Sequence, residues 1–192
     1  MIIKGSIHSF SLGKQNKNLF KFSIGSSRTD KKEDCRKITR RMICNLVKKD
    51  KRYKYKKIDI RNSDNEYRLG QPILYSDGVE SKLKISISHD NRICFVACSD
   101  SCIGIDTSQI RSFKKYEYLF RDCIEQINVC VSSDYFYTLL WTIKESFTKS
   151  IGIKNEIILE VSDKFGTIEH SSLAFYYFTL NNYIFMICII CN

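Results

Sequence analysis

Residues 83–106, LKISISHDNRICFVACSDSCIGID, constrain the fold more than any other stretch of the sequence. They contain short runs of β-branched and apolar residues, separated by the polar clusters HDNR and SDS. These runs are Leu83–Ser88, Ile93–Ser99 and Cys102–Asp106. Clusters of this length are typical of hairpin turns, so the pattern predicts a β-meander. The first and third strands of a meander run in the same direction, so His89 and Asp106 should lie near each other at one edge of the sheet.

A helix is predicted over residues 31–49, with Asp30 as its N-cap. Its apolar face consists of Cys35, Ile38, Met42 and Leu46, which recur at helical spacing. Basic residues fill the other faces: Arg36, Arg40, Arg41 and Lys48. The pattern is that of a half-buried, basic helix.

A second helix is predicted from residue 134 to near Gly152. Its buried face consists of Leu140, Ile143, Phe147 and Ile151. A neighbouring stripe carries Trp141, Glu145 and Lys149, each four residues from the last. We expect Trp141 to belong to the core, because aromatic residues on helices are usually buried. Glu145 and Lys149 can form an ordinary surface ion pair, worth about 0.2–0.5 kcal/mol.

The order of the remaining elements completes the predicted fold. Further strands are expected at residues 2–10, 56–61 and 153–161, with a turn into an extended segment at 68–74 and a hairpin at 173–190 that turns at Asn181 and Asn182. The predicted order is thus one strand, a helix and further strands, followed by a second helix and further strands. This order predicts an α+β protein of two similar lobes, residues 1–101 and 102–192. One Pro and eight Gly leave little linker, so the lobes should pack closely as a monomer.

Composition narrows the classes of function. The chain has nine cysteines but enough apolar residues to form a core without disulfides, so we expect free thiols in a reducing compartment. Neither a signal peptide nor a membrane span is predicted, and a cytoplasmic location follows. The net charge of +10 favours an acidic partner or ligand. The run KKDKRYKYKK at residues 48–57 is either a phosphate-contacting patch or a solvated face.

Candidate chemistry gathers around the second helix. The meander places His89, which follows Ser88, near Asp106, which follows Gly104. Carboxylates from separate elements, here Asp106 and Glu145, suit Mg²⁺, which uses one or two protein carboxylates together with water and substrate phosphates. A lysine beside them would hold a phosphate oxygen. The combination points to phosphoryl-group chemistry.

These residues also carry a family resemblance. The motifs ISISH, IGIDTSQ and WTIKESFTKSIG, with the flanking DYFYTLLW and the turn GQPIL, occur in this order over residues 68–152. The set resembles the signature of the 4'-phosphopantetheinyl transferases of the surfactin-synthetase-activating type. The helix EDCRKITRRMICNLV matches that family more loosely.

The resemblance implies two pseudo-symmetric α+β lobes with coenzyme A in the cleft between them. It implies transfer of the phosphopantetheine arm from coenzyme A to a serine hydroxyl of an apo acyl or peptidyl carrier protein, with release of 3',5'-ADP. Carrier proteins of this kind are typically acidic, which suits the positive charge of the chain. Neither a nucleic acid nor a membrane is then expected as a partner.

Individual roles follow from the matched motifs. Asp106 and Glu145 would hold Mg²⁺ on the pyrophosphate, Glu145 or a water it positions would take the serine proton, and Lys149 would steady the phosphate. The remaining contacts to the coenzyme would come from Ser88, His89, Gly70, Gln71, Pro72, and Arg41 or Arg68.

The sequence departs from the family pattern at two positions. Ser108 stands where many relatives have a further acidic residue, and Gln71 stands where a lysine is usual. Metal and coenzyme affinity should therefore differ from those of relatives. The basic residues expected before the first helix have Lys21 and Arg28 as candidates.

Two other readings of the sequence stay open. One is a basic nucleic-acid-binding protein that uses residues 48–57. The other is a relative that binds coenzyme A or a carrier without catalysis, as the departures at Ser108 and Gln71 would allow.

Overall fold

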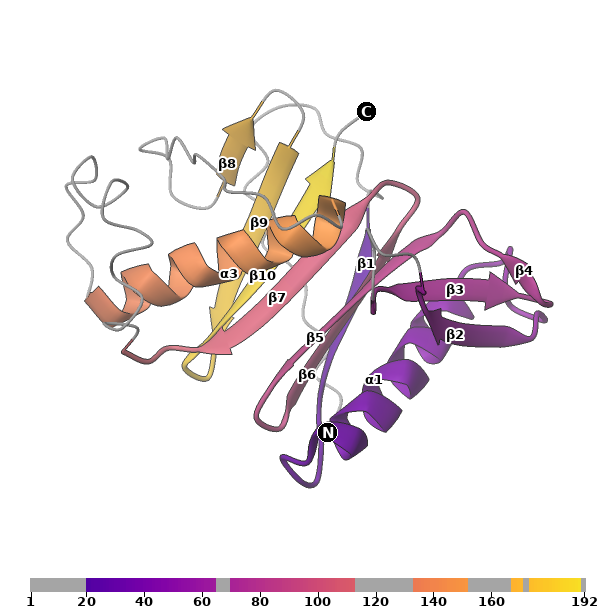
Figure 1. The fold of residues 1–192 in the computed structure, drawn as a ribbon, viewed down its shortest axis with the longest axis horizontal. Helices are drawn as coiled ribbons and strands as arrows, with labels where there is room; N and C mark the ends of the chain where they lie inside the picture. Colours follow the sequence, from indigo (N-terminus) through magenta and orange to yellow (C-terminus); the bar gives the residue numbers. More distant parts are fainter. Residues whose placement is uncertain (1–19, 65–69, 113–132, 152–166, 171–172, 191–192) are drawn as a thin grey trace.

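The structure, a computed structural model, describes residues 20–64, 70–112, 133–151, 167–170 and 173–190. The described part is an α+β fold of helices and small antiparallel sheets (Figure 1). Its N-terminal half contains β1 (Lys21–Ser26), α1 (Lys32–Val47), β2 (Ile58–Asn62), β3 (Pro72–Ser76), β4 (Val79–Glu80), β5 (Lys84–Asp90) and β6 (Ile93–Ser99). Its C-terminal half contains β7 (Ile103–Gln109), α3 (Ser133–Ile151), β8 (Thr167–His170), β9 (Leu173–Leu180) and β10 (Tyr183–Ile190).

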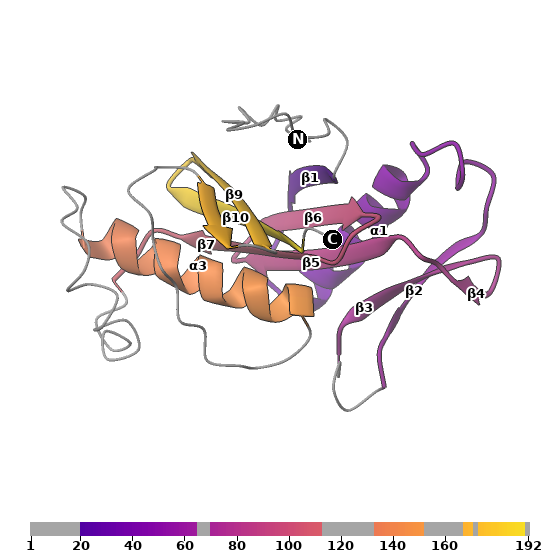
Figure 2. The ribbon, with the colours of Figure 1, turned by 90° about the horizontal axis from the view of Figure 1, so that it is seen from above.

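The strands of the described residues form three sheets. One has the order β1-β6-β5, another the order β7-β10-β9-β8, and the small third sheet has the order β2-β3-β4. Helix α1 packs on the first sheet and α3 on the second. Figure 2 shows α3 lying along one face of its sheet, with the small sheet beyond the C-terminal end of this helix.

The hairpin turns have the chemistry that their sequences predict. Asn181 and Asn182, between β9 and β10, have φ values of 49° and 62°, a left-handed conformation that Asn tolerates better than most residues. Asp77 and Gly78 form the equivalent turn between β3 and β4, with φ values of 51° and 85°. The predicted turn at 181–182 is confirmed, as is the hairpin of β5 and β6.

Helix α1 forms where the periodicity predicts it, but with a different N-terminus. The N-cap position is Lys31, and its side chain makes no capping bond, so the prediction of Asp30 was wrong. Thr29 acts here instead, because its Oγ1 accepts a hydrogen bond from the Lys31 N–H at 3.3 Å and donates one to Asp34. The buried face is rotated by one position: Thr39 and Ile43 are buried, whereas the predicted Ile38 and Met42 are only half-buried.

The predicted meander is wrong at its second turn. Strands β6 and β7 belong to different sheets, so the segment around Ser99–Ser101 is a crossover and not a hairpin. Strand β7 nevertheless lies beside β5 and runs parallel to it, as the constant offset between bonded residues shows. The predicted common direction of the two strands is therefore confirmed.

Side chains of β5 replace backbone carbonyls in holding β7. The N–H of Ile105 donates to Ser86 Oγ at 3.1 Å, that of Thr107 to Ser88 Oγ at 3.3 Å, and that of Gln109 to Asp90 Oδ2 at 2.8 Å. Alternate side chains of a strand point to the same face, so the polar residues of SISHD form one row. We call this row, Ser86, Ser88 and Asp90, the polar ladder.

Apolar packing also joins the two larger sheets. A cluster of aromatic and aliphatic side chains spans them, and Phe95 of β6 meets Phe185 of β10 edge-to-face with ring centroids 5.3 Å apart. Phe178 stacks on Phe185 at 5.0 Å. Two further clusters lie under α1 and under α3. The core is therefore continuous across the crossover between β6 and β7.

Several predictions can be compared with the described residues. The six cysteines among them are free thiols, as expected, and Cys35, Cys94, Cys98 and Cys188 are buried. No helix in the described ranges has the length and apolarity that a membrane crossing requires. The strands predicted at 2–10 and 153–161 lie outside the described residues, whereas β1, β4 and β8 were not predicted.

Candidate functional site

The site is built where the backbone of α3 lies directly on β7. A Cβ atom at Gly104 would be 1.9 Å from the carbonyl oxygen of Ser146 and 2.4 Å from the backbone nitrogen of Ser150. Only glycine allows this approach. At the other end of the contact, Thr138 Oγ1 lies 3.3 Å from the backbone nitrogen of Arg111. Helix α3 therefore runs antiparallel to β7.

A stripe of small hydroxyl residues makes this approach possible. Thr138, Thr142, Ser146 and Ser150 recur every four residues of α3, and all are buried. Each hydroxyl donates to a carbonyl oxygen of the preceding turn, at 2.7–2.9 Å. The hydroxyls are thus satisfied within the helix. The predicted apolar stripe forms a separate contact, in which Leu140 and Ile143 pack on β9 and β10.

Asp106, Ser88 and Lys149 meet at this contact. The Oδ1 atom of Asp106 accepts hydrogen bonds from Ser88 Oγ at 2.8 Å and from Lys149 Nζ at 2.7 Å. Asp106 is 5% exposed. A buried carboxylate requires a compensating charge, and Lys149 supplies it. Lys149 therefore bonds to Asp106 and not to Glu145, its neighbour one turn back on the same helix.

The hydrogen bonds of Ser88 fix the direction of its proton. Its oxygen accepts from the Thr107 N–H at 3.3 Å and lies 3.2 Å from Lys149 Nζ. Neither group can accept a hydrogen bond, so both acceptor lone pairs of the hydroxyl are used. Its single proton then points to Asp106 Oδ1, which accepts it.

Glu145 lies on the same side of α3 as Lys149 and is half-buried. Helix α3 contacts the β7 segment at two places, Ser146 at Gly104 and Thr138 at Arg111, and Glu145 lies between these two contacts in the sequence of the helix. Asp106 lies between the same two contacts on the strand. The structure thus sets both predicted carboxylates along one stretch of the α3–β7 contact.

A cavity of about 510 Å³ opens beside Lys149. It is lined by the start of β3, by β5 and by the last turn of α3, and it includes Gly70, Gln71, Pro72 and Lys149 among the predicted residues. Gln71 Nε2 donates to the carbonyl oxygen of Lys149 at 3.3 Å and so ties the turn before β3 to the C-terminal end of α3. Lys149 thus belongs both to the cavity and to the contact with Asp106.

His89 lies in a positively charged surrounding. It is half-buried on β5, and burial is the main cause that lowers its pKa below the usual 6.5. The charges of Lys149, Lys32 and Arg36 lower the pKa further, and Asp90 acts in the opposite direction. The nearby cations lower the pKa of His89 because they disfavour a further positive charge, and the same positive charges favour binding of an anion here. The contributions of Lys32 and Arg36 were not predicted, although their spacing of four residues places them on one face of α1.

The other predicted cations have different positions. Arg41 is exposed on α1, five residues after Arg36, which places it on a different face of the helix. Its role stays a prediction, as does that of Arg68, which lies outside the described residues. Arg28 is exposed, immediately before Thr29.

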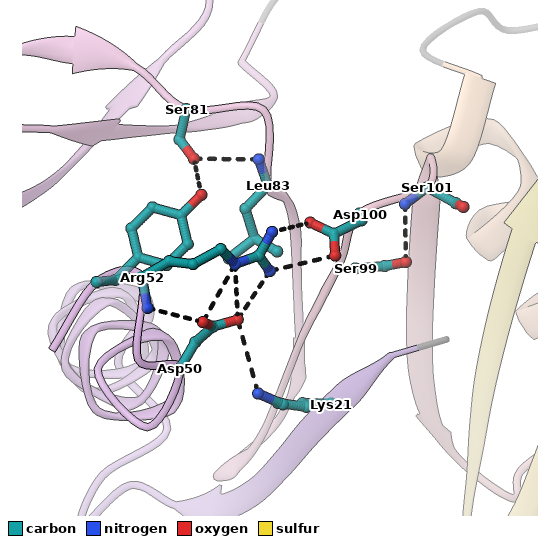
Figure 3. A network of polar contacts seen from close by, with 9 residues as sticks. Lys21, Asp50, Arg52, Ser81, Leu83, Ser99, Asp100 and Ser101 are labelled. Carbon is teal, nitrogen blue, oxygen red and sulfur yellow. Dashed lines mark hydrogen bonds and ion pairs between the residues drawn. The ribbon is translucent and has the colours of Figure 1, made fainter. Parts of the chain in front are cut away.

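Lys21, the other N-terminal candidate, is part of a network at the far end of α1 (Figure 3). Its Nζ lies 3.8 Å from Asp50 Oδ2. The guanidinium of Arg52 bonds Asp50 at 2.8 Å and Asp100 at 2.9 Å, and so fastens the end of α1 to the crossover between β6 and β7. Lys21 thus lies beside this network, and its role as a coenzyme contact stays a prediction.

The donor set was compared with what a divalent metal requires. No group of three or more His, Cys, Asp or Glu side chains gathers among the described residues. Mg²⁺ often uses only one or two protein carboxylates and takes its remaining ligands from water and substrate phosphates. Asp106 on β7 and Glu145 on the adjoining α3 would be the carboxylates of such a substrate-completed site, with Ser108 further along β7.

Comparisons with known proteins give no family. No protein-family model matches the sequence, and no curated protein matches it. The functional interpretation therefore depends on the motifs and on the geometry of the site.

Proposed function

We propose that the protein transfers the 4'-phosphopantetheine group of coenzyme A to a serine hydroxyl of an apo carrier protein. One observation carries the proposal: Asp106, a buried carboxylate from the strand of the IGID motif, bonds both Ser88 of the ISISH motif and Lys149 of the KESFTK motif. Residues far apart in the chain, which the family resemblance groups into one site, thus contact one another beside a cavity.

The strand orders support the two-lobe form of this proposal. In the sheet β1-β6-β5, the strand that comes first in sequence pairs with the last one, and the last one pairs with the strand before it. In the sheet β7-β10-β9-β8, the strands β7, β10 and β9 repeat this order. In the described ranges, α1 packs on the first of these sheets and α3 on the second, and each helix follows the first strand of its sheet in sequence. We take these equivalent units as the two pseudo-symmetric lobes, divided near residue 101.

The coenzyme would occupy the cavity and the charged region beside it. Its nucleotide part would lie along Gly70, Gln71 and Pro72, which line the cavity. Its phosphates would approach Lys149 and His89, where Lys32 and Arg36 add positive charge. Clustered cations of this kind hold phosphate groups strongly where water is partly excluded.

The reaction forms one bond and breaks another at the same phosphorus atom. The serine oxygen of the carrier attacks the phosphorus that bears the pantetheine arm, the pyrophosphate P–O bond breaks, and 3',5'-ADP leaves. Glu145, or a water that it orients, accepts the serine proton. Lys149 neutralises negative charge on the phosphate. Mg²⁺, held by Asp106 and Glu145, would supply further charge stabilisation of the pyrophosphate.

A direct assay tests the proposal. The protein is incubated with an apo acyl carrier protein, coenzyme A and Mg²⁺, and the carrier is weighed by mass spectrometry. We expect a gain of one phosphopantetheine, abolished by EDTA and by Asp106→Asn or Glu145→Gln. Arg61→Lys, at an exposed position of β2, serves as the control. An unmodified carrier in the presence of bound coenzyme A would instead indicate a non-catalytic relative.

A second candidate function has an observation of its own. In the segment 48–57 the side chains of Lys48, Lys49, Lys51, Lys54 and Lys57 are exposed, and Tyr55 is 88% exposed. Exposed cations interleaved with an aromatic ring are typical of single-stranded nucleic-acid binding. Binding of a labelled oligonucleotide that weakens steeply with salt, and is lost on Lys51→Glu with Lys54→Glu, would favour this function.

A further inference from the structure

We propose that Lys149 is the resident counter-ion of Asp106, and that a divalent cation binds this carboxylate by taking the place of the lysine ammonium. The inference deepens the proposed function and rests on it for the identity of the metal site. It adds a means of regulation, because the bonding partner of the Lys149 ammonium depends on whether a metal is bound at Asp106.

Asp106 is buried beside its charge partner. The carboxylate is 5% exposed, and in the described part of the chain Lys149 is the cation that forms an ion pair with it. The hydroxyl of Ser88 donates a hydrogen bond but brings no charge. Removing the lysine alone would leave a buried, uncompensated negative charge, which proteins tolerate poorly.

A cation that binds Asp106 competes with Lys149 for the same carboxylate. Both Ser88 and Lys149 bond Oδ1 of Asp106, and Lys149 lies 2.7 Å from it. A divalent cation coordinated to this carboxylate would lie within a few ångströms of the ammonium, where like charges repel strongly at low dielectric. The two cations therefore exclude each other.

Lys149 also has somewhere to move. Its side chain is 31% exposed, and it lines the cavity beside Gln71 and Pro72. A lysine ammonium on a four-carbon stem changes position easily. Once replaced at Asp106, the ammonium of Lys149 is free to bond the coenzyme phosphates, whose proposed place is the charged region of Lys149 and His89 beside the cavity. Metal binding and phosphate binding would then be coupled through this residue.

The decisive experiment measures metal binding without coenzyme or carrier. Lys149→Met is compared with the unchanged protein by calorimetric titration with Mg²⁺ and Mn²⁺. Thermal unfolding of both proteins is also measured with and without either ion, at about 10 mM, which suits a weak Mg²⁺ site. We expect the metal-free variant to have a lower Tm, which either ion restores. We expect its metal affinity to rise about tenfold, a change typical of coupling between two ligands.

Three variants make the result specific. Lys144→Met makes the same substitution on the same helix and should change neither metal affinity nor the metal-induced shift in Tm. Lys149→Gln, whose amide still donates to Asp106, keeps the test available if the Met variant does not fold without metal; its metal affinity should rise as well. Asp106→Asn combined with Lys149→Met should abolish the stabilisation by metal.

The outcomes separate this inference from the proposed function. Equal metal affinity and equal shifts in Tm for the unchanged protein, Lys149→Met and Lys149→Gln would overturn the inference, even if phosphopantetheine is transferred. Exchange of lysine for metal without any modification of a carrier would support the inference and contradict the transfer reaction.

Discussion

The backbone N–H of Ile105 donates to the hydroxyl oxygen of Ser86 at 3.1 Å, where a paired strand would normally offer a carbonyl. Ser88 and Asp90 accept from Thr107 and Gln109 in the same way. Strands β5 and β7 are therefore joined by side chains and belong to separate sheets. Because the same Ser88 hydroxyl also donates to Asp106, this junction and the candidate site share a residue.

Loss of one acceptor in the polar ladder should weaken the junction. Ser86→Ala leaves the buried N–H of Ile105 without its partner, and we expect a loss of about 1–3 kcal/mol in the free energy of unfolding. Urea titration followed by circular dichroism measures it. Ser26→Ala, at an exposed position of β1, is the control and should change stability little. Equal stability of the two variants would show that water replaces Ser86.

Gly104→Ala should separate α3 from β7. The added Cβ would meet the backbone of Ser146 and Ser150, which cannot move without the helix. We expect a loss of about 1–3 kcal/mol or more in the free energy of unfolding from overpacking. Gly25→Ala is a matched control, since its Cβ would meet the flexible side chain of Met42. A similar small effect of both substitutions would contradict the close helix–strand contact.

The sequence predicts the elements of this site better than their arrangement. Alternation and turn residues located β5, β6, β7 and the hairpin at Asn181, and helical periodicity located α1 and α3, because these signals are local. The crossover between β6 and β7 was read as a hairpin because a short polar turn serves either connection. Whether this turn becomes a hairpin or a crossover depends on whether β7 pairs with β6 or with β10, and tertiary packing decides this pairing.

The packing of α3 shows a second limit of sequence reading. Its stripe of Thr138, Thr142, Ser146 and Ser150 is polar and was not part of the predicted buried face, yet it is buried against β7. The signal that could have revealed it is the small size of all four residues opposite Gly104, which permits close backbone approach. Similarly, the pairing of Lys149 with Asp106 was hidden, because the periodicity alone favours its neighbour Glu145.

Replacement of Arg52 should raise the pH at which the protein unfolds in acid. The Arg52 guanidinium is the main cause that lowers the pKa of Asp50 from 3.8 to about 2. A lowered carboxyl pKa contributes stability above the unfolded value, which is lost as the pH falls through the folded value. Arg52→Lys keeps the charge but loses the forked bonds to Asp50 and Asp100. We therefore expect the pKa of Asp50 to rise and acid unfolding to begin at higher pH.

Carbon-13 NMR titration of the Asp50 carboxyl measures this pKa directly. The control is Arg61→Lys, which alters a comparable pair with Asp59 whose side chains are both more than half exposed. That change should leave the acid unfolding midpoint where it is, because exposed pairs contribute little. An unchanged Asp50 pKa in Arg52→Lys would mean that charge alone, and not the fork, lowers it.

Titration of His89 should link pH to stability and to anion binding. Its pKa in the folded protein is below 6.5, chiefly through burial and then through Lys149, Lys32 and Arg36, with Asp90 opposing. Between the folded pKa and 6.5 the unfolded chain binds more protons. The free energy of unfolding should therefore fall as the pH drops below 6.5, and His89→Gln should remove this dependence.

An anion reverses the effect on His89, because a negative charge beside the imidazole favours its protonated form. A histidine titrates roughly between pH 6 and pH 7.5, and sulfate stays a dianion over this range. Sulfate should therefore raise the His89 pKa and stabilise the protein more at about pH 6 than at about pH 7.5. Proton NMR of the imidazole and thermal unfolding in sulfate measure the two effects. His89→Gln should bind sulfate with the same strength at both pH values. A His89 pKa that sulfate leaves unchanged would place the anion away from β5, and the phosphates of the coenzyme with it.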